Sequence, residues 1–379
     1  MKLSAWAVAL CGLAALAVAM GIGRFAFTPI LPMMQEDRGI SVSEGGWLAS
    51  ANYLGYLLGA LAAAHPKLRA HQAIRAGLAL ISIATLAMAF ETHFLGWMLL
   101  RFVPGFGSAW VLVYVSVWGL ERLAQAGRPG LGGAVFAGVG AGIAGAGVVC
   151  LVFSKAHAGS ASAWLALGLS AALVSVLLWP VFGPVKPAPA LAAPGKSPLR
   201  IPEFWRYVFV HGAFGLGYII PATFLPVMAK AVMSDPAWFG WAWPAFGTAA
   251  MISTLGAAKL QELIGTRNVW ALGNVVMATG SLLPLALPGL TGILLAAICV
   301  GGTFMVLTMI GMQEARRAAG DRARLLMAAM TSAFAAGQIA GPLLVAALAP
   351  RQGGFSLALA TAALPLLAAA WLIYTKEER

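Results

Sequence analysis

Charged residues and cysteines are scarce in this sequence. Only 9% of the 379 residues are charged, whereas 61% are hydrophobic, and the mean hydropathy is +0.87. Soluble domains contain roughly 25% charged residues, so this composition excludes an ordinary soluble protein and predicts a membrane protein. The three cysteines, Cys11, Cys150 and Cys299, have neither a CxxC spacing nor a neighbouring histidine. We therefore expect them to be small helix residues, and we expect no metal and no cofactor.

Motifs of enzymes and nucleic-acid-binding proteins are also missing. The sequence contains no Walker loop and no Ser/His/Asp set. GAGIAG at 140–145 matches GxGxxG, but it lies inside an apolar run without a preceding strand, so it does not predict a dinucleotide site. The basic residues behind the net charge of +12 form short clusters between apolar runs. We expect neither an enzyme nor a nucleic-acid-binding protein.

Long apolar runs fill most of the chain. They are too long for the alternating strands of a membrane barrel, so they predict helices that satisfy their own backbone hydrogen bonds in lipid. The first run begins like a signal peptide but continues to about residue 31, which favours a membrane span. A window of about 20 residues predicts twelve spans, at 4–33, 46–64, 73–91, 94–120, 131–154, 161–183, 205–230, 237–258, 268–286, 289–312, 323–349 and 353–375.

The predicted spans form two similar halves. A stretch rich in proline and basic residues, 184–204, separates a six-helix bundle at 1–183 from a second one at 205–379. GIGRFAFTPILPMM at 21–34 aligns with GLGYIIPATFLPVM at 215–228, and the same offset of 194 residues pairs Gly147 with Gly341. We therefore predict an all-α polytopic membrane protein of two pseudo-symmetric bundles, with a site near mid-membrane between them.

Several motifs resemble those of the major facilitator superfamily. RFVPGFGSA at 101–109 resembles its Arg-x-x-x-Gly-x-Gly-x-Ala motif, and GQIAGP at 337–342 resembles its gating-helix motif. With GIGRFAFTPILPMMQ and ANYLGYLLGA, these segments are similar to the YbfB/YjiJ-type branch of bacterial transporters. The loop HPKLRAHQAIR at 65–75 departs from the superfamily, because it lacks the glycine and aspartate of Gly-x-x-x-Asp-Arg-x-Gly-Arg. A partial version of this motif remains as Glu262, Gly265 and Arg267.

The resemblance implies a bacterial inner-membrane protein with six plus six helices. The basic loop residues also favour cytoplasmic termini. Small-residue spacing at Gly138 and Gly142 favours close helix packing. Together with the motifs, it assigns gating or packing roles to six residues, Gly105, Gly142, Gly147, Gln338, Gly341 and Pro342.

Two arginines, Arg24 and Arg101, lie inside the predicted spans and away from their cytoplasmic ends. A cation at the centre of the bilayer costs roughly 3 kcal/mol on insertion scales, so Arg24 and Arg101 must face protein or water. They lie at similar depth, and the resemblance implies that their spans line a central cavity. No Asp or Glu lies mid-span to neutralise them. We therefore expect both to bind an anionic substrate, with two alternatives: Arg24 reaches out to the membrane surface, and Arg101 holds a helix interface.

Other polar residues within the spans are weaker candidates. Tyr218, the repeat counterpart of Arg24, and Asn52, which lies near Tyr53 and Tyr56, are candidate substrate ligands. His211 is the histidine within a predicted span, which makes it the candidate for proton coupling, with a purely structural role as the alternative.

These residues favour one function over two alternatives. The prediction is a monomeric secondary transporter in the lipid bilayer that moves a small organic anion by proton symport or anion exchange. An efflux pump for amphipathic compounds is the first alternative, because four side chains offer an adaptable apolar lining: Trp241, Trp243, Met305 and Met309. A membrane sensor or channel that transports nothing by alternating access is the second.

Overall fold

The structure of the protein is a computed structural model, which describes residues 3–65, 68–183, 200–232, 236–348 and 354–375. This described part is helical and contains no strand, which confirms the predicted all-α fold. Its first half comprises α1 (Ala5–Leu16), the π-helix η1 (Ala17–Phe25), α2 (Phe27–Arg38), α3 (Val42–Ala63), α4 (Ala70–Ala87), α5 (Phe94–Gln125), the short helix η2 (Pro129–Leu131), α6 (Gly132–Lys155) and α7 (Ser160–Leu178).

The second half is built in the same way from long helices. It comprises α8 (Ile201–Val232), α9 (Pro236–Ile264), α10 (Thr266–Ala286), α11 (Leu290–Ala319), the short helix η3 (Gly320–Arg322), α12 (Ala323–Leu348) and α13 (Gly354–Tyr374). Each predicted span coincides with one of these helices or, for the first span, with the continuous run from α1 to α2. Of the predicted linker, 184–199 lies outside the described residues, and α8 already begins at Ile201.

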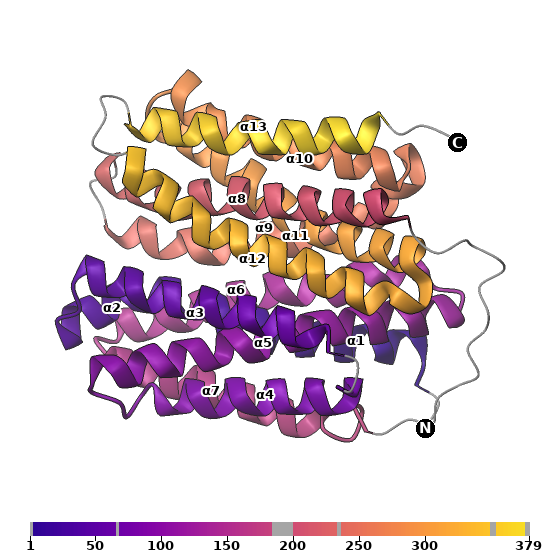
Figure 1. The fold of residues 1–379 in the computed structure, drawn as a ribbon. Coiled ribbons are helices and arrows are strands. Elements are labelled where there is room, and N and C mark those ends of the chain that lie inside the picture. The colour runs from indigo at the N-terminus through magenta and orange to yellow at the C-terminus, as the bar shows by residue number, and fades with distance from the viewer. Residues whose placement is uncertain (1–2, 66–67, 184–199, 233–235, 349–353, 376–379) are drawn as a thin grey trace.

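The helices lie roughly parallel and form two groups. In Figure 1, the helices up to α7 lie below those from α8 onward. The first helix begins and the last helix ends at the same end of the bundle, on the right. We call this end the terminal end. An even number of membrane crossings places both chain ends on one side, as the twelve predicted spans require.

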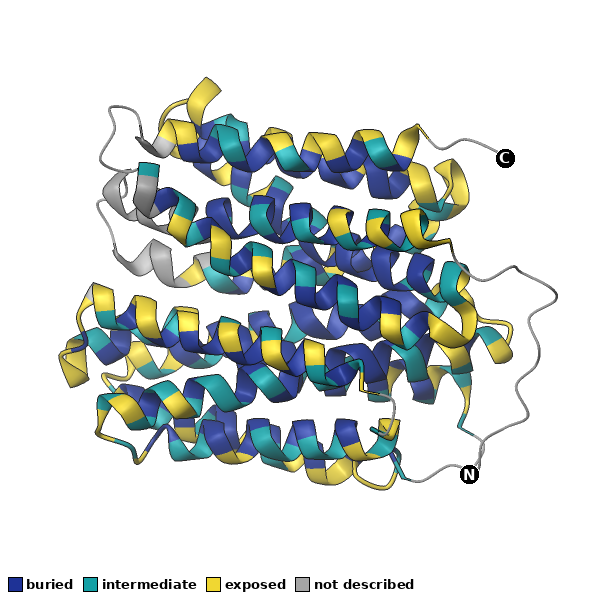
Figure 2. Cartoon of the chain, in the orientation of Figure 1, coloured by how far each residue is buried: buried dark blue, intermediate teal, exposed yellow. Residues whose placement is uncertain are grey.

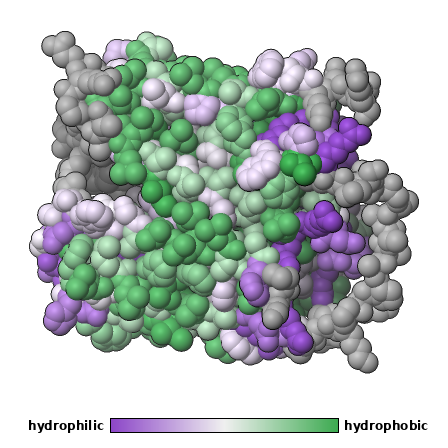
Figure 3. All heavy atoms as spheres, in the orientation of Figure 1, coloured by the Kyte–Doolittle hydropathy of each residue, from purple (hydrophilic) through white to green (hydrophobic). Residues whose placement is uncertain are grey.

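The surface is apolar around the middle of the bundle. Figure 3 shows hydrophobic side chains over the central part of one face and hydrophilic ones gathered toward the ends. Large apolar side chains are exposed, with 80% exposure for Leu95 and 69% for Val176. Eight segments of the described chain are long and apolar enough to cross a membrane, and one of them, Leu290–Val345, includes both α11 and most of α12. The chain is a multi-pass membrane protein.

The first span changes helix type near its middle. It begins as α-helix, continues as the π-helix η1 and returns to α-helix at Phe27. Two prolines follow η1, and Pro32 interrupts the hydrogen-bond ladder of α2 because it has no backbone N–H. The wider turns of a π-helix are rare in proteins and often mark functional sites. In this chain the π-helix contains Arg24.

Two repeat-related helix pairs join the halves. Shifting α6 by the repeat offset gives α12, and shifting α3 gives α9, so the pair α6–α9 corresponds to the pair α12–α3. Gly140 of α6 and Gly247 of α9 lie so close that a methyl group on either would overlap the backbone of the other helix. Small residues allow this approach in lipid, where dispersion forces rather than the hydrophobic effect hold helices together.

Candidate functional site

Arg24 is buried between the two halves. Its residue is only 4% exposed, and its guanidinium lies 3.6 Å from the ring centroid of Tyr56 on α3. The rings of Phe25 and Tyr53 lie at 5.6 Å and 5.8 Å from the same group. The negative faces of aromatic rings attract a cation, so these contacts compensate part of its desolvation. Arg24 Nη2 also donates a 2.6 Å hydrogen bond to Gln338 Oε1 on α12, which links the first span to the second half.

Several buried N–H donors of Arg24 and Gln338 have no acceptor among the described residues. Arg24 Nε and Nη1 and Gln338 Nε2 are buried and have no hydrogen-bond partner in the part of the chain that the structure describes. No ion pair among the described residues includes Arg24 or Arg101. A buried donor without an acceptor costs free energy, more so when it is charged. We call Arg24, Gln338, Tyr53 and Tyr56 the Arg24 cluster. Its free N–H donors and its positive charge can bind an anion.

Asn52 and Arg101 hold the backbone beside Arg24. Asn52 Nδ2 donates to the carbonyl oxygens of Gly23 at 3.2 Å and of Arg101 at 2.9 Å. Arg101 Nη2 donates in turn to the carbonyl oxygen of Arg24 at 3.3 Å. These bonds tie η1, α3 and α5 together, and the close packing of Gly105 against the Asn52 carbonyl brings α3 and α5 into contact. Both residues thus position Arg24, and direct binding of substrate by either stays a prediction.

Tyr218 faces a group of aromatic rings in the second half. It is buried and stacks on Phe304 of α11, with ring centroids 4.5 Å apart and planes 14° apart. Phe304 also meets the ring of Phe25 edge-on at 5.5 Å. The aromatic group of the second half therefore reaches the residue next to Arg24. Sequence reasoning missed Phe304 and Phe25, because an aromatic residue in an apolar helix gives no signal of its own.

His211 lies inside the second half. It is 2% exposed, and both ring nitrogens are buried without a hydrogen-bond partner among the described residues. Its ring lies 5.9 Å from that of Phe214 and 6.4 Å from that of Trp270, and a methyl group at Gly311 would overlap it. None of these neighbours belongs to the Arg24 cluster. Proton coupling through His211 stays a prediction.

The remaining predicted residues lie at helix contacts. Gly142 of α6 crosses η1 at Ala17 and Gly21, and Gly147 lies against the ring of Pro244 in the other half. Gly341, which precedes Pro342 in α12, lies against Ile219 of α8. The four residues that motivated the efflux alternative do not form one lining, because Trp241 is 52% exposed while Met305 and Met309 are fully buried. Figure 2 shows how the buried positions run through the middle of the bundle.

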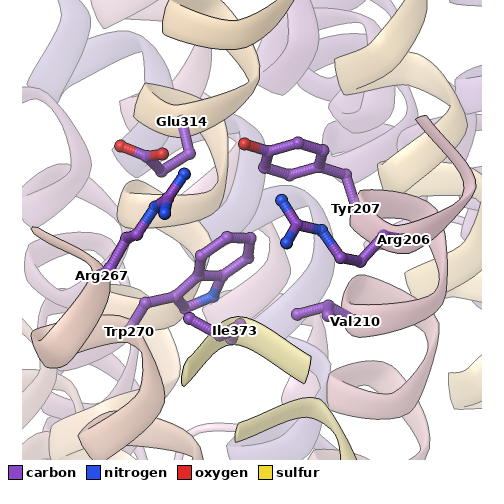
Figure 4. Close-up of a pocket in the computed structure, with 7 residues that line it drawn as sticks. All are labelled: Arg206, Tyr207, Val210, Arg267, Trp270, Glu314 and Ile373. Atoms are coloured by element: carbon purple, nitrogen blue, oxygen red, sulfur yellow. The ribbon is translucent and has the colours of Figure 1, made fainter. Parts of the chain in front are cut away.

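A separate cavity lies at the terminal end of the second half. It has a volume of about 420 Å³ and is lined by Tyr207, Gly265, Thr266, Arg267, Asn268, Glu314, Arg317 and Ala318. It therefore contains two members of the partial repeat motif, Gly265 and Arg267. Figure 4 shows an adjoining recess, where Arg206 and Arg267 extend toward Tyr207, Glu314 and Trp270. Glu314 pairs with Arg317 at 3.0 Å. This cavity shares no lining residue with the Arg24 cluster.

Repeated helical halves that enclose a buried polar cluster define a membrane transporter of the major facilitator type. The chain belongs to the family described as "Uncharacterised MFS-type transporter YbfB", which it matches over residues 16–374. No match was found among curated proteins. In terms of fold it is similar to two solved structures. The human organic anion transporter MFSD10 (TETRAN) has 13% identity and a TM-score of 0.76, with 96% of this chain and 99% of that chain covered.

The second similar structure is FucP, a major facilitator transporter in its outward conformation. It has 14% identity and a TM-score of 0.73, with 97% of this chain and 98% of that chain covered. Identities at this level establish the shared fold. They do not carry a substrate from one protein to another, so the chemistry of the Arg24 cluster must provide the argument for function.

Proposed function

We propose that the protein is a secondary active transporter of a small organic anion, with Arg24 as the anion-binding group. The observation that carries the proposal is the buried Arg24 guanidinium, two of whose nitrogens have no hydrogen-bond partner, and which contacts no carboxylate, among the residues that the structure describes. A guanidinium keeps its charge at every physiological pH, so burial does not neutralise it. A carboxylate or a similar oxyanion would satisfy its free N–H groups and offset its charge.

The bond between Arg24 and Gln338 suggests how binding is linked to movement of the halves. It joins the π-helix of the first half to α12 of the second, and the unused Gln338 Nε2 lies on the same side chain. An anion that binds Arg24 competes with the glutamine oxygen for the guanidinium. Binding would therefore weaken this contact between the halves and favour their rocking motion, as alternating access requires.

Coupling to protons and exchange of anions both fit this scheme. His211 is the candidate proton carrier in the symport form, whereas exchange of one anion for another needs no titrating group. We propose a monomer in a bacterial inner membrane with cytoplasmic termini.

Counterflow in proteoliposomes tests the proposal. Vesicles loaded with unlabelled lactate, succinate or benzoate are given the labelled acid outside, and a carrier shows accelerated uptake that a channel or sensor does not. We expect trans-stimulation with at least one acid and its loss in Arg24→Gln. Arg75→Gln is the control, because Arg75 lies away from Arg24 and contacts Trp179, with hydrogen bonds to its carbonyl oxygen at 3.0 Å and 2.6 Å and a cation–π contact with its ring at 5.0 Å. Equal counterflow by Arg24→Gln and the native protein would refute the proposal.

The symport form has its own test. If His211 carries the coupled proton, His211→Gln abolishes uptake driven by a pH gradient but leaves exchange of anions intact. Uptake that remains driven by the pH gradient in this variant would exclude the histidine relay and leave exchange as the proposed mode.

A further inference from the structure

We propose that the cargo is an aromatic carboxylate, bound with its carboxylate on Arg24 of the first half and its ring against Tyr218 and Phe304 of the second. This inference rests on the proposed anion transport and specifies the substrate class of the same site. It follows from the different chemistry that the two halves bring to one place.

The second half presents aromatic rings from four helices. Tyr218 of α8 stacks on Phe304 of α11, and Phe334 of α12 lies nearly parallel to Tyr218, with centroids 6.2 Å and planes 25° apart. Phe246 of α9 lies 6.2 Å from Phe304. These four rings, which we call the aromatic group, face one another at the distances that ring pairs prefer.

The first half presents polar groups at the same place. Tyr53, Tyr56 and the fork of Arg24 lie together, with the hydrogen bonds of Asn52 and Arg101 holding the helix behind them. The positive charge disfavours a cationic cargo, because like charges repel strongly where water is excluded. The polar side therefore suits the acidic end of a molecule.

Phe25 joins the polar side to the aromatic group. Its ring centroid lies 5.6 Å from the Arg24 guanidinium and 5.5 Å from the centroid of Phe304. The Phe25 ring thus contacts both the cation and a member of the aromatic group. One small molecule can place a carboxylate within hydrogen-bonding distance of Arg24 and an aryl ring within stacking distance of Phe304. The molecule would insert where Phe25 of the first half meets Phe304 of the second half edge-on.

Ring stacking distinguishes aromatic from saturated cargo. An aromatic pair gains more than its buried area alone provides, because the edge of one ring is positive and the face of another is negative. An aromatic acid should therefore bind roughly 2- to 10-fold more tightly than an acid with a saturated ring of similar size. An aliphatic acid would retain the carboxylate contact but lose this preference.

Titration calorimetry of the purified full-length protein tests the inference with three probes. Benzoate has both features, cyclohexanecarboxylate has the charge and a saturated ring, and benzamide has the ring without the charge. We expect the tightest binding for benzoate, binding roughly 2- to 10-fold weaker for cyclohexanecarboxylate, and none for benzamide. Phe304→Leu should weaken benzoate to the level of cyclohexanecarboxylate and leave the saturated acid unchanged.

The control and the alternative variant keep the test decisive. Phe182→Leu removes an equally buried phenylalanine, which contacts Trp118 at 4.9 Å outside the aromatic group, and should preserve the preference. Phe304→Met, which removes the ring but nearly keeps the volume, replaces Phe304→Leu if the latter does not fold. Equal binding of both ring acids in the native protein, unaffected by Phe304→Leu, overturns the aromatic assignment and leaves anion transport standing. Absence of binding by both ring acids overturns the aromatic assignment, and absence of counterflow with lactate and succinate as well overturns anion transport.

Discussion

Arg24 and Tyr218 occupy equivalent positions of the internal repeat, yet their surroundings differ. Arg24 lies among hydrogen-bonding groups, whereas Tyr218 lies among phenylalanines. The same offset relates Asn52 of the polar side to Phe246 of the aromatic group. The two halves thus share the same helix arrangement, but equivalent positions carry polar side chains in the first half and aromatic ones in the second. Because of this difference, the proposed site has a charged end and an apolar end.

The Phe304 position shows the same divergence. Its repeat counterpart is Trp110, which packs on Phe106 at 4.8 Å within its own half. Phe304 instead contacts Phe25 across the boundary between the halves. The ring of the second half therefore lies toward the proposed substrate site, while the first half uses the equivalent ring for internal packing. Four changes test this division, and they follow in order of decreasing effect.

Removing the charge from the polar half should have the largest effect. Arg24→Gln keeps a side chain that can bond to Gln338 but removes the charged donors, so we expect transport to fall by roughly 100-fold or more. The ligand-free variant should unfold at a higher temperature, because the native protein buries an uncompensated cation. Counterflow and thermal unfolding measure the two effects. A variant with lower stability and unchanged transport would show that Arg24 serves only the fold.

Widening the glycine contact between the halves should have the next largest effect. Gly147→Leu pushes a side chain into the ring of Pro244 and should cost roughly 1–3 kcal/mol in the states that keep this contact. Gly145→Leu on the same helix is the matched control, because nothing lies within 4 Å of the position of its added Cβ. Transport rates of the two variants give the readout. Equal rates would show that α6 and α9 do not need this close approach.

Substituting the two buried asparagines, Asn52 and Asn274, tests the same comparison of the halves and should give a smaller effect. Asn52 joins three helices of the polar half, whereas the side chain of Asn274 in the second half bonds, among the described residues, to the Trp270 carbonyl oxygen of its own helix at 2.9 Å. Asn52→Ala leaves two carbonyl groups without their donor and should weaken anion binding by roughly 5- to 30-fold. Asn274→Ala should leave binding unchanged. A similar loss in both variants would contradict a positioning role specific to Asn52.

The loop before α5 should give the smallest effect. Glu91 accepts hydrogen bonds from the backbone N–H groups of His93 and Thr92, which lower the pKa of its carboxyl group. A lowered pKa adds stability above the ordinary carboxyl pKa, and this stability is lost as the pH falls through the folded-state value. The corresponding loop of the second half, 286–289, has no carboxylate. Glu91→Gln should therefore lower the unfolding temperature slightly at pH 7 and by less at pH 3.

An unfolding temperature for Glu91→Gln that differs from the native value equally at both pH values would show that ionisation of Glu91 is not the cause. The comparison needs native protein in the same detergent at each pH, because other carboxyl groups also titrate in this range.

The sequence predicted the membrane helices well because hydropathy is a local property. Ser41 and Glu44, which cap the start of α3, are also readable from the sequence. The presence of Arg24 in an apolar run likewise marked it as a candidate. Its π-helix was not predictable, because that conformation depends on packing against Gly142 as well as on local propensity.

The partners of Arg24 were also beyond sequence reasoning. Gln338 was expected to have a gating or packing role, and it lies 314 positions along the chain from the arginine it binds. Phe304 lies in an apolar helix, where one more aromatic residue is unremarkable by composition. Burial on its own, as for His211, does not indicate which cavity a side chain faces. These relationships depend on how the halves meet, which no single span encodes.

Titration of benzoate into the native protein and into Arg24→Gln and Arg24→Lys tests the central claim most directly. We predict saturable binding by the native protein, no binding by Arg24→Gln, and weakened binding by Arg24→Lys, which keeps the charge but loses the fork. Equally tight binding by the native protein and Arg24→Gln would contradict the assignment of Arg24 as the group that binds the anion.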